Sequence, residues 1–195
     1  MDLQELEPVA TAALPLDEFR AHLRLGTGFA DDTSTDALLE RYLRAALATI
    51  EARTGKTLFS RRFLLVLPQW RWPDAQAFPL APVSAIETLE MRETDGNRTP
   101  VTAGWRLVPD WHRPQIVATG ATLPSVPTGA MIEVTMLAGF SATWAGLPDD
   151  LRQAVLLLAA IYYEGRSGGA EGIPASVESL LARWKSVRIG AGRVL

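Results

Sequence analysis

Two histidines, His22 and His112, are the only candidates for imidazole chemistry in this chain. Glu18 lies four residues before His22 in a segment predicted to be helical, so the two side chains would share a helix face and could hold a metal ion. Such a site needs at least one more ligand, whereas His112 belongs to a distant loop next to Pro114. Cysteine is absent, which excludes thiolate ligands and thiol catalysis. We therefore expect no metal site and no cofactor.

The segment Gly165–Gly169 matches G-x-S-x-G, the sequence of a nucleophile-bearing turn. That turn requires a strand before it, a helix after it, and an acid and a histidine later in the chain. Here a predicted helix precedes the segment and no histidine follows residue 112, so we interpret it as a flexible linker. Paired acids at 31–32 and 149–150 lie at predicted helix starts, where they oppose the helix dipole. We predict no catalytic residues.

Trp70 and Trp72 flank Arg71, and interleaved basic and aromatic residues can stack on single-stranded nucleic acid. Tryptophans also fill thin cores and contacts between subunits. We favour the second interpretation because the local excess of positive charge is slight. The formal net charge of the whole chain is −3, which argues against nucleic-acid binding through bulk electrostatics.

Length and composition indicate one globular domain, or one domain that carries an insertion. The chain has 195 residues, and 48% are hydrophobic, which is enough for a substantial core. The acidic start, MDLQELEPVATAALPLDEF, lacks the basic region and apolar stretch of a secretory signal. No segment reaches transmembrane length. We expect a soluble, cytosolic protein without membrane contact.

Apolar periodicity predicts four helices, near residues 16–24, 35–54, 148–164 and 175–184. The second is the best determined, because a broad apolar stripe from Leu38 to Ile50 recurs at helical spacing. Glu40 and Arg44 lie one turn apart on its other face, where they can pair. Gly55 is placed to end this helix.

The middle of the chain is rich in proline and tryptophan and contains short β-like runs. The predicted strands are 62–67, 84–91, 105–108, 115–118 and 131–137. The turn signal Thr94–Asn97 predicts a hairpin between the second and third of these strands. Pro79–Pro82 must lie at a sheet edge or in a connector, because proline cannot donate to a strand ladder.

These elements predict an α+β fold in which a helical bundle core carries an inserted small antiparallel β module. The predicted parts are an N-terminal helical part (1–57), a β-rich insertion (58–140), a C-terminal helical part that packs on the first (141–184) and an extended basic tail (185–195).

The apolar run Ala154–Tyr163 is the most informative stretch of the sequence. Ten apolar residues are too few to cross a bilayer, and a helix that is apolar on nearly every face must be buried by other protein. The chain offers few helical partners, so we expect neighbouring subunits to complete the packing. We predict that Tyr42, Leu158, Tyr162 and Tyr163 contribute to contacts between subunits.

The order of these segments resembles the head–tail connector (adaptor) proteins of long-tailed phages, prophages and gene transfer agents, in particular the branch with a β insertion. The resemblance covers residues 14–166. Its most specific pieces are E-x-R-T-G-K (51–56), V-T-x-x-A-G-F (134–140) and L-P-x-x-L-R-Q-A (147–154). None of these is a catalytic signature, which agrees with the expectation that the protein is not an enzyme.

The resemblance implies a structural protein of the virion neck, made in the bacterial cytoplasm, that forms a ring, usually of twelve copies. Such a ring lies between the portal and the stopper or tail and extends the DNA channel without binding DNA specifically. In this family C-terminal segments reach the portal. Here the portal-binding candidates are Arg188, Ile189, Arg193, Val194 and Leu195.

Two alternative functions stay open at this point. A neck or tail-completion protein one layer further from the portal would differ only in its partners. A small accessory enzyme of DNA packaging is the weaker alternative, because it would need polar residues that converge in a pocket. The sequence does not distinguish a phage, a prophage and a gene transfer agent, and it assigns no partner to the β insertion.

Overall fold

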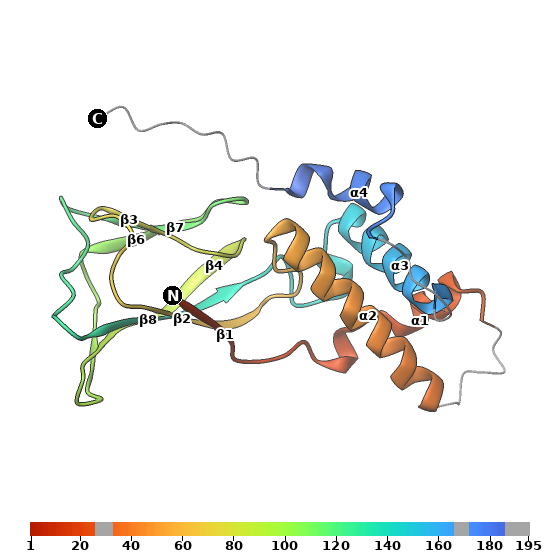
Figure 1. The fold of residues 1–195 in the computed structure, drawn as a ribbon, viewed down its shortest axis with the longest axis horizontal. Helices are drawn as coiled ribbons and strands as arrows, with labels where there is room; N and C mark the ends of the chain where they lie inside the picture. The colour runs from red at the N-terminus through yellow and green to blue at the C-terminus, as the bar shows by residue number, and fades with distance from the viewer. Residues whose placement is uncertain (26–32, 166–171, 186–195) are drawn as a thin grey trace.

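The computed structural model describes residues 1–25, 33–165 and 172–185. The elements, with η for a short 3₁₀ helix, are β1 (Asp2–Glu5), η1 (Thr11–Ala13), α1 (Leu16–His22), α2 (Thr33–Thr54), β2 (Arg61–Leu67), β3 (Ala75–Ala77), β4 (Val83–Arg92), β5 (Arg98–Pro100), β6 (Trp105–Val108), β7 (Gln115–Ala118), β8 (Met131–Ala138), η3 (Trp144–Gly146), α3 (Asp149–Glu164), α4 (Ala175–Leu181) and η5 (Ala182–Trp184). The α+β class is confirmed. The strands gather at one end of an elongated molecule and the helices at the other (Figure 1).

The helical end is built around α2 and α3, with α1 and α4 packed beside them. All four predicted helices are present, and the third and fourth begin directly after Pro148 and Pro174. The apolar stripe of α2 faces the core, and Gly55 follows the helix with φ +67°, a conformation that favours glycine. Arg44 Nε donates to Glu40 Oε1 at 2.7 Å on the other face, as the spacing predicts.

The chain itself buries most of the apolar run in α3. Seven residues of this helix are buried against α1, α2 and α4, among them Leu158 at 1% exposure. Leu157, Tyr162 and Tyr163 stay only half-buried at the edge of the same cluster. The apolar surface that α3 leaves uncovered is therefore much smaller than a helix apolar on every face would present. No helix in the described ranges is long and apolar enough to span a membrane.

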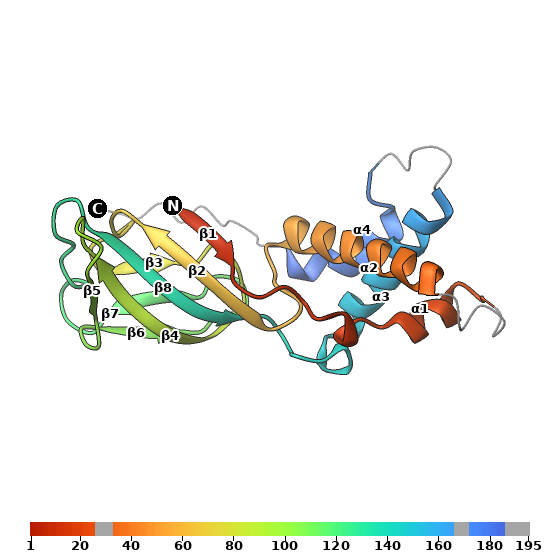
Figure 2. The ribbon, with the colours of Figure 1, turned by 90° about the horizontal axis from the view of Figure 1, so that it is seen from below.

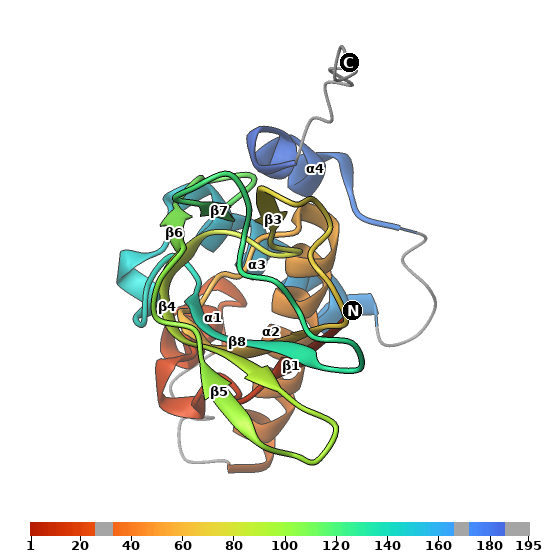
Figure 3. The same ribbon diagram turned by 90° about the vertical axis from the view of Figure 1, so that its left-hand side faces the viewer.

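The β end consists of two antiparallel sheets with a hydrophobic cluster between them. The larger sheet has the order β1-β2-β8-β4-β5 and the smaller β3-β7-β6. Alternate residues of β2, Phe63, Leu65 and Leu67, face the cluster, and Ile116 of β7 faces it from the opposite sheet. Viewed along the long axis, the smaller sheet lies above the larger one (Figure 3). Figure 2 shows β2, β8 and β4 side by side in the larger sheet.

Three strands occur that the sequence does not predict: β1, β3 and β5. Each has only three or four residues, and β1 and β5 are exposed throughout, so neither carries an apolar alternation. The hairpin prediction is correct for the turn but wrong for the partner strand. Residues 94–97 join β4 to β5, whereas β6, the expected partner, pairs with β7 in the other sheet. Pro79–Pro82 connects β3 to β4, as predicted.

Two of the chain segments that join the helical end to the β end lie side by side. Leu58 O accepts the Phe140 N–H at 2.9 Å, which ties the segment before β2 to the segment after β8. The segments approach closely at Gly139, where an added Cβ would lie 2.4 Å from Phe59 O. With φ +131°, Gly139 also occupies a conformation that other residues rarely adopt. Glycine is therefore required at this point of the connection.

A charged cluster fixes the first residue of β2 to both ends of the molecule. The Arg61 side chain, only 10% exposed, bonds to Glu51 of α2 at 2.8 Å and to Glu5 of β1 at 2.8 Å. Glu51 Oε1 also accepts the Leu58 N–H at 2.7 Å. Glu7 pairs with Arg62 in the same way, so two acids of the N-terminal segment are each held by an arginine of β2.

Candidate assembly surfaces

A tyrosine patch on α2 and α3 contains three of the four residues predicted to contact other subunits. The rings of Tyr42 and Tyr163 meet edge to face with centroids 5.8 Å apart. Tyr162 OH and Thr49 Oγ1 lie 3.0 Å apart, which ties the two helices together. Between them is a shallow, mostly apolar hollow of about 360 Å³, lined by Tyr42, Ala45, Ile161, Tyr162 and Gly165. Half-buried aromatic rings around an apolar hollow are typical of contact surfaces.

Leu158, the fourth predicted contact residue, lies inside the chain's own helical cluster, beneath the tyrosine patch. It can therefore act on a subunit contact only by supporting the helices that carry the exposed rings. The sequence pattern does not distinguish a residue buried within the chain from one exposed at its surface, because every residue of the run is apolar.

The five residues predicted to bind the portal, Arg188, Ile189, Arg193, Val194 and Leu195, lie outside the described residues. The described chain before them is firmly attached to the helical end. Trp184 is buried, its Nε1 donates to Asp150 Oδ2 at 2.8 Å, and its ring meets Phe140 edge to face. Lys185 pairs with Glu178 of α4. Trp184 and Lys185 are therefore both fixed to the helical end.

Of the two residues considered for a metal site, Glu18 accepts the Trp144 Nε1–H on its Oε2 at 2.6 Å. No three His, Asp or Glu residues in the described ranges gather as a metal site would require. Of the G-x-S-x-G segment, only Gly165 is described, and it follows a helix where the catalytic turn needs a strand.

Lys56 is a buried cation that sequence reasoning missed. Its side chain is 2% exposed, and Nζ donates to Trp111 O at 2.6 Å and lies 3.2 Å from His112 Nδ1. Burial lowers the pKa of Lys56, and the Asp110 carboxylate opposes this effect. The Asp110 carboxylate also accepts the backbone N–H groups of His112 and Arg113, which lowers the pKa of Asp110. Lys56 thus holds the 110–113 loop against the connection between the two ends.

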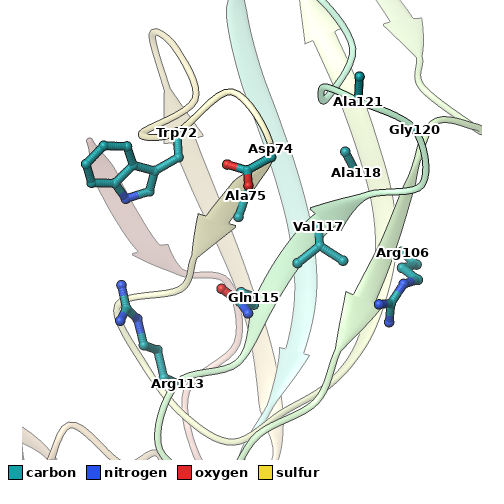
Figure 4. A pocket seen from close by; sticks show the side chains of 10 residues that line it. All are labelled: Trp72, Asp74, Ala75, Arg106, Arg113, Gln115, Val117, Ala118, Gly120 and Ala121. Carbon is teal, nitrogen blue, oxygen red and sulfur yellow. The ribbon is translucent and has the colours of Figure 1, made fainter. Parts of the chain in front are cut away.

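A groove of about 810 Å³ lies over the smaller sheet (Figure 4). Its lining residues are Trp72, Asp74, Ala75, Arg106, Arg113, Gln115, Val117, Ala118, Gly120 and Ala121. Trp72 comes from the loop before β3, Arg113 from the loop before β7, and Arg106 from β6 on the other side. The sequence contains a signal for this groove, because alternation along residues 105–108 places Arg106 opposite the core-facing Trp105 and Leu107.

The tryptophans divide between the two interpretations. Trp70 and Trp105 pack against the β cluster and donate their indole N–H groups to Pro124 O and Val101 O, both at 2.8 Å. Trp111 is exposed at its edge but stacks on Phe140. Trp72 is exposed in the groove, where the Arg71 guanidinium lies over its ring. Most of these rings therefore stabilise the chain itself, and Trp72 presents its exposed surface in the groove.

Comparisons with known proteins identify a family and solved structures that are similar to this chain. Residues 14–97 match the phage gp6-like head–tail connector protein family. No curated protein sequence matches the chain. Among solved structures, a chain in the neck of an empty gene transfer agent (GTA) particle, computed with C6 symmetry, is 54% identical, with a TM-score of 0.92 over 99% of this chain and 100% of that chain.

Two further structures match over the same shares of both chains. One is the virion of a native GTA particle, with 54% identity and a TM-score of 0.89. The other is the neck of a native GTA particle computed with C12 symmetry, with 50% identity and a TM-score of 0.86. The match therefore includes the helical end and the β end together. The chain belongs to the phage gp6-like head–tail connector family.

Proposed function

We propose that this protein is a structural head–tail adaptor that forms a ring in the neck of a phage-like particle of the GTA type. The observation that carries the proposal is the match to GTA neck chains over 99% of this chain, which includes the β end and the helical end together. A partial match would support only a shared module. Its partners are other copies of itself, the portal on one side and the stopper or tail on the other.

We propose twelve copies per ring. The related neck structures were computed with C6 and with C12 symmetry, and a ring of twelve obeys both, because a sixfold rotation is two steps of a twelvefold one. Ring contacts are heterologous, so each copy must present two different surfaces. The mildly acidic chain suits a channel wall along which DNA slides, since cationic walls would bind phosphate.

The tyrosine patch is the proposed lateral contact at the helical end. Tyr42, Tyr162 and Tyr163 offer partly exposed rings around an apolar hollow, and Leu158 supports them from within. Ala45 is an exposed residue in the hollow, so Ala45→Glu adds a charge there at little cost to folding. We expect the Ala45→Glu protein to fold but to form few rings. Ala175→Glu, at the exposed start of α4, is the matched control and should form rings normally.

The C-terminal residues are the proposed portal-binding segment. They follow Trp184 and Lys185, which are fixed to the helical end, and ten residues reach roughly 33 Å when extended. Arg188 and Arg193 can pair with acids of the portal, while Ile189, Val194 and Leu195 can enter an apolar pocket.

Deletion of residues 190–195 tests the proposal. The truncated protein should keep the thermal unfolding midpoint of the full chain but should fail to join capsids to tails, counted by electron microscopy. Replacement of the same six residues by Gly and Ser keeps the length, and it should also fail if the side chains are recognised. Normal joining by either variant contradicts portal binding by this segment. Absence of the labelled chain from the neck contradicts the adaptor function itself.

A further inference from the structure

The groove over the smaller sheet is lined by residues of its three strands and of the loops beside them. Across the three strands, the register places Ala75, Val117 and Arg106 side by side on the face away from the core. Small and short side chains make the floor, and Trp72 and Arg113 rise at one side (Figure 4).

The groove is positively charged. Arg106 and Arg113 are exposed, and neither takes part in an ion pair with another described residue. Asp74 also lines the groove, which leaves one net positive charge on its walls. Exposed guanidinium groups on both sides of a groove, one of them on the same side as an aromatic ring, fit a peptide segment that carries carboxylates.

The turn between β4 and β5, residues 93–97, has the complementary charge. Glu93 and Asp95 are exposed at its tip, and neither forms an ion pair with another described residue. The turn is held in shape by three hydrogen bonds: Glu93 N–H to Asn97 O at 2.8 Å, Gly96 N–H to Glu93 O at 3.0 Å, and Asn97 N–H to Asp95 Oδ1 at 2.8 Å. Gly96 supplies the φ of +87° that this turn requires.

The base of the hairpin explains why the acids at its tip remain without a cation. Arg92 and Arg98, the two cations nearest to the turn in the sequence, both bond to Glu133 of β8, with Arg98 Nε 2.9 Å from Oε2. They are therefore not available to Glu93 or Asp95. The hairpin is a well-braced projection with two carboxylates exposed at its end.

We propose that the 93–97 turn of one copy enters the groove of the next copy in the ring, with Glu93 and Asp95 against Arg106 and Arg113. This inference rests on the proposed ring and assigns a partner to the β end. The groove and the turn lie on opposite sides of the molecule, the smaller sheet above and the hairpin below (Figure 3). Opposite placement is what a head-to-tail contact between identical copies requires for closure by rotation.

The charges in the groove suit a protein segment better than they suit DNA. Phosphate binding of useful strength needs many cations along a track, and this groove offers two arginines and one acid. The matching acids occur once on every copy, so a ring satisfies each groove with one turn and leaves none open.

Cross-linking tests the contact directly, because the chain contains no cysteine. A chain with Asp95→Cys and Arg113→Cys, assembled into particle necks and treated with a short bis-maleimide, should give a ladder of multimers on denaturing gels. Each single variant should give no product beyond a dimer, and Asp95→Cys with Ser179→Cys on α4 is the matched pair that should give no ladder. Rings seen by microscopy without a ladder overturn this inference and leave the adaptor function intact. Particles without rings of this chain overturn the proposed function.

Charge reversal supplies a second test, which is measured by the number of completed necks. Arg106→Glu with Arg113→Glu should lower the number of completed necks about tenfold, because the groove then carries only acids where Glu93 and Asp95 enter it. Adding Glu93→Lys and Asp95→Lys to the same chain should restore neck assembly, since each copy contributes both surfaces. Assembly that is unaffected by the first pair, or not restored by the second, overturns the proposal. Loss of single-stranded oligonucleotide binding by the first pair, with assembly unchanged, would assign the groove to nucleic acid instead.

Discussion

The two ends of this molecule achieve their stability in different ways. In the helical end, α2 and α3 meet through a continuous apolar cluster, and the pairs Glu40–Arg44 and Arg53–Glu178 lie at its surface. In the β end, the cluster between the sheets is accompanied by buried polar groups, Glu133 and Gln76, each with hydrogen-bond partners. Apolar packing tolerates changes of pH and salt, whereas a buried carboxylate depends on its ionised state. The two ends should therefore fail under different conditions.

The largest expected loss of stability comes from the apolar contact between α2 and α3. Leu158→Ala should lower the free energy of unfolding by about 2–5 kcal/mol, because it opens a cavity in a cluster with little freedom to collapse. Urea unfolding measures the change. Leu157→Ala, at the half-buried neighbouring position, is the control and should cost about half as much. Equal losses of stability at the two positions would contradict the difference in burial between Leu158 and Leu157.

The connection between the ends is the next most sensitive place. Gly139→Ala should cost roughly 2–4 kcal/mol, because it forces a Cβ against Phe59 O and strains a backbone at φ +131°. Gly165→Ala is the matched control, since an added Cβ there meets nothing within 4 Å and its φ of −76° suits any residue. Thermal unfolding of both variants measures the difference. A near-neutral Gly139→Ala would show that the two connecting segments can move apart.

The fold of the helical end could be predicted from the sequence more completely than the fold of the β end. The helices were predictable because α2 and α3 repeat an apolar period over several turns, and because each helix has a proline or glycine at its boundary, as Pro148 and Gly55 illustrate. Strands β6 and β7 were predicted with correct ends. Short strands such as β3 and β5 are defined by their partners in the sheet, and no local period reveals a partner.

The candidate surfaces were predictable only in part. Tyr42 and Tyr163 were predicted to contact other subunits because the apolar run of α3 needs more partners than the chain's own helices offer. The structure shows that the two rings meet each other, and their contact with other subunits stays a prediction. Burial of Leu158 depends on which face of α3 the chain covers, which requires the packed fold. The groove combines residues 72, 106 and 113 from three separate segments, and only the register of the smaller sheet brings them together.

Acidification should weaken the β end before the helical end. Burial raises the pKa of Glu133, but hydrogen bonds from Arg98 and Arg92 and their charges outweigh it and hold the pKa below its usual range. Stability from this carboxylate is therefore complete above its ordinary pKa of 4.5 and is lost as the pH falls through its lower folded value. Glu133→Gln should cost roughly 1–3 kcal/mol at neutral pH and should flatten the acid dependence of unfolding.

Glu40→Gln provides the comparison from the helical end. Arg44 lowers the pKa of Glu40 as well, but this pair lies at the surface, where solvent screens it. The substitution should change the acid dependence of unfolding less than Glu133→Gln does. The same urea series, repeated from about pH 3 to about pH 7, measures both variants over the range in which carboxylates titrate. If the loss of stability at acidic pH changes more in Glu40→Gln than in Glu133→Gln, the carboxylate that causes it lies at the helical end instead.

The smallest effect on stability is expected at Lys56, where the two ends meet. Keeping this ammonium group buried costs free energy, which offsets what its bonds to the 110–113 loop contribute. Lys56→Met keeps the length of the side chain without the charge, so the free energy of unfolding should stay within about 1 kcal/mol of the original. Amide hydrogen exchange at His112 and Arg113 should nevertheless become faster, because their loop loses its attachment. Slow exchange in this variant would assign the loop's order to the stacking of Trp111 on Phe140 instead.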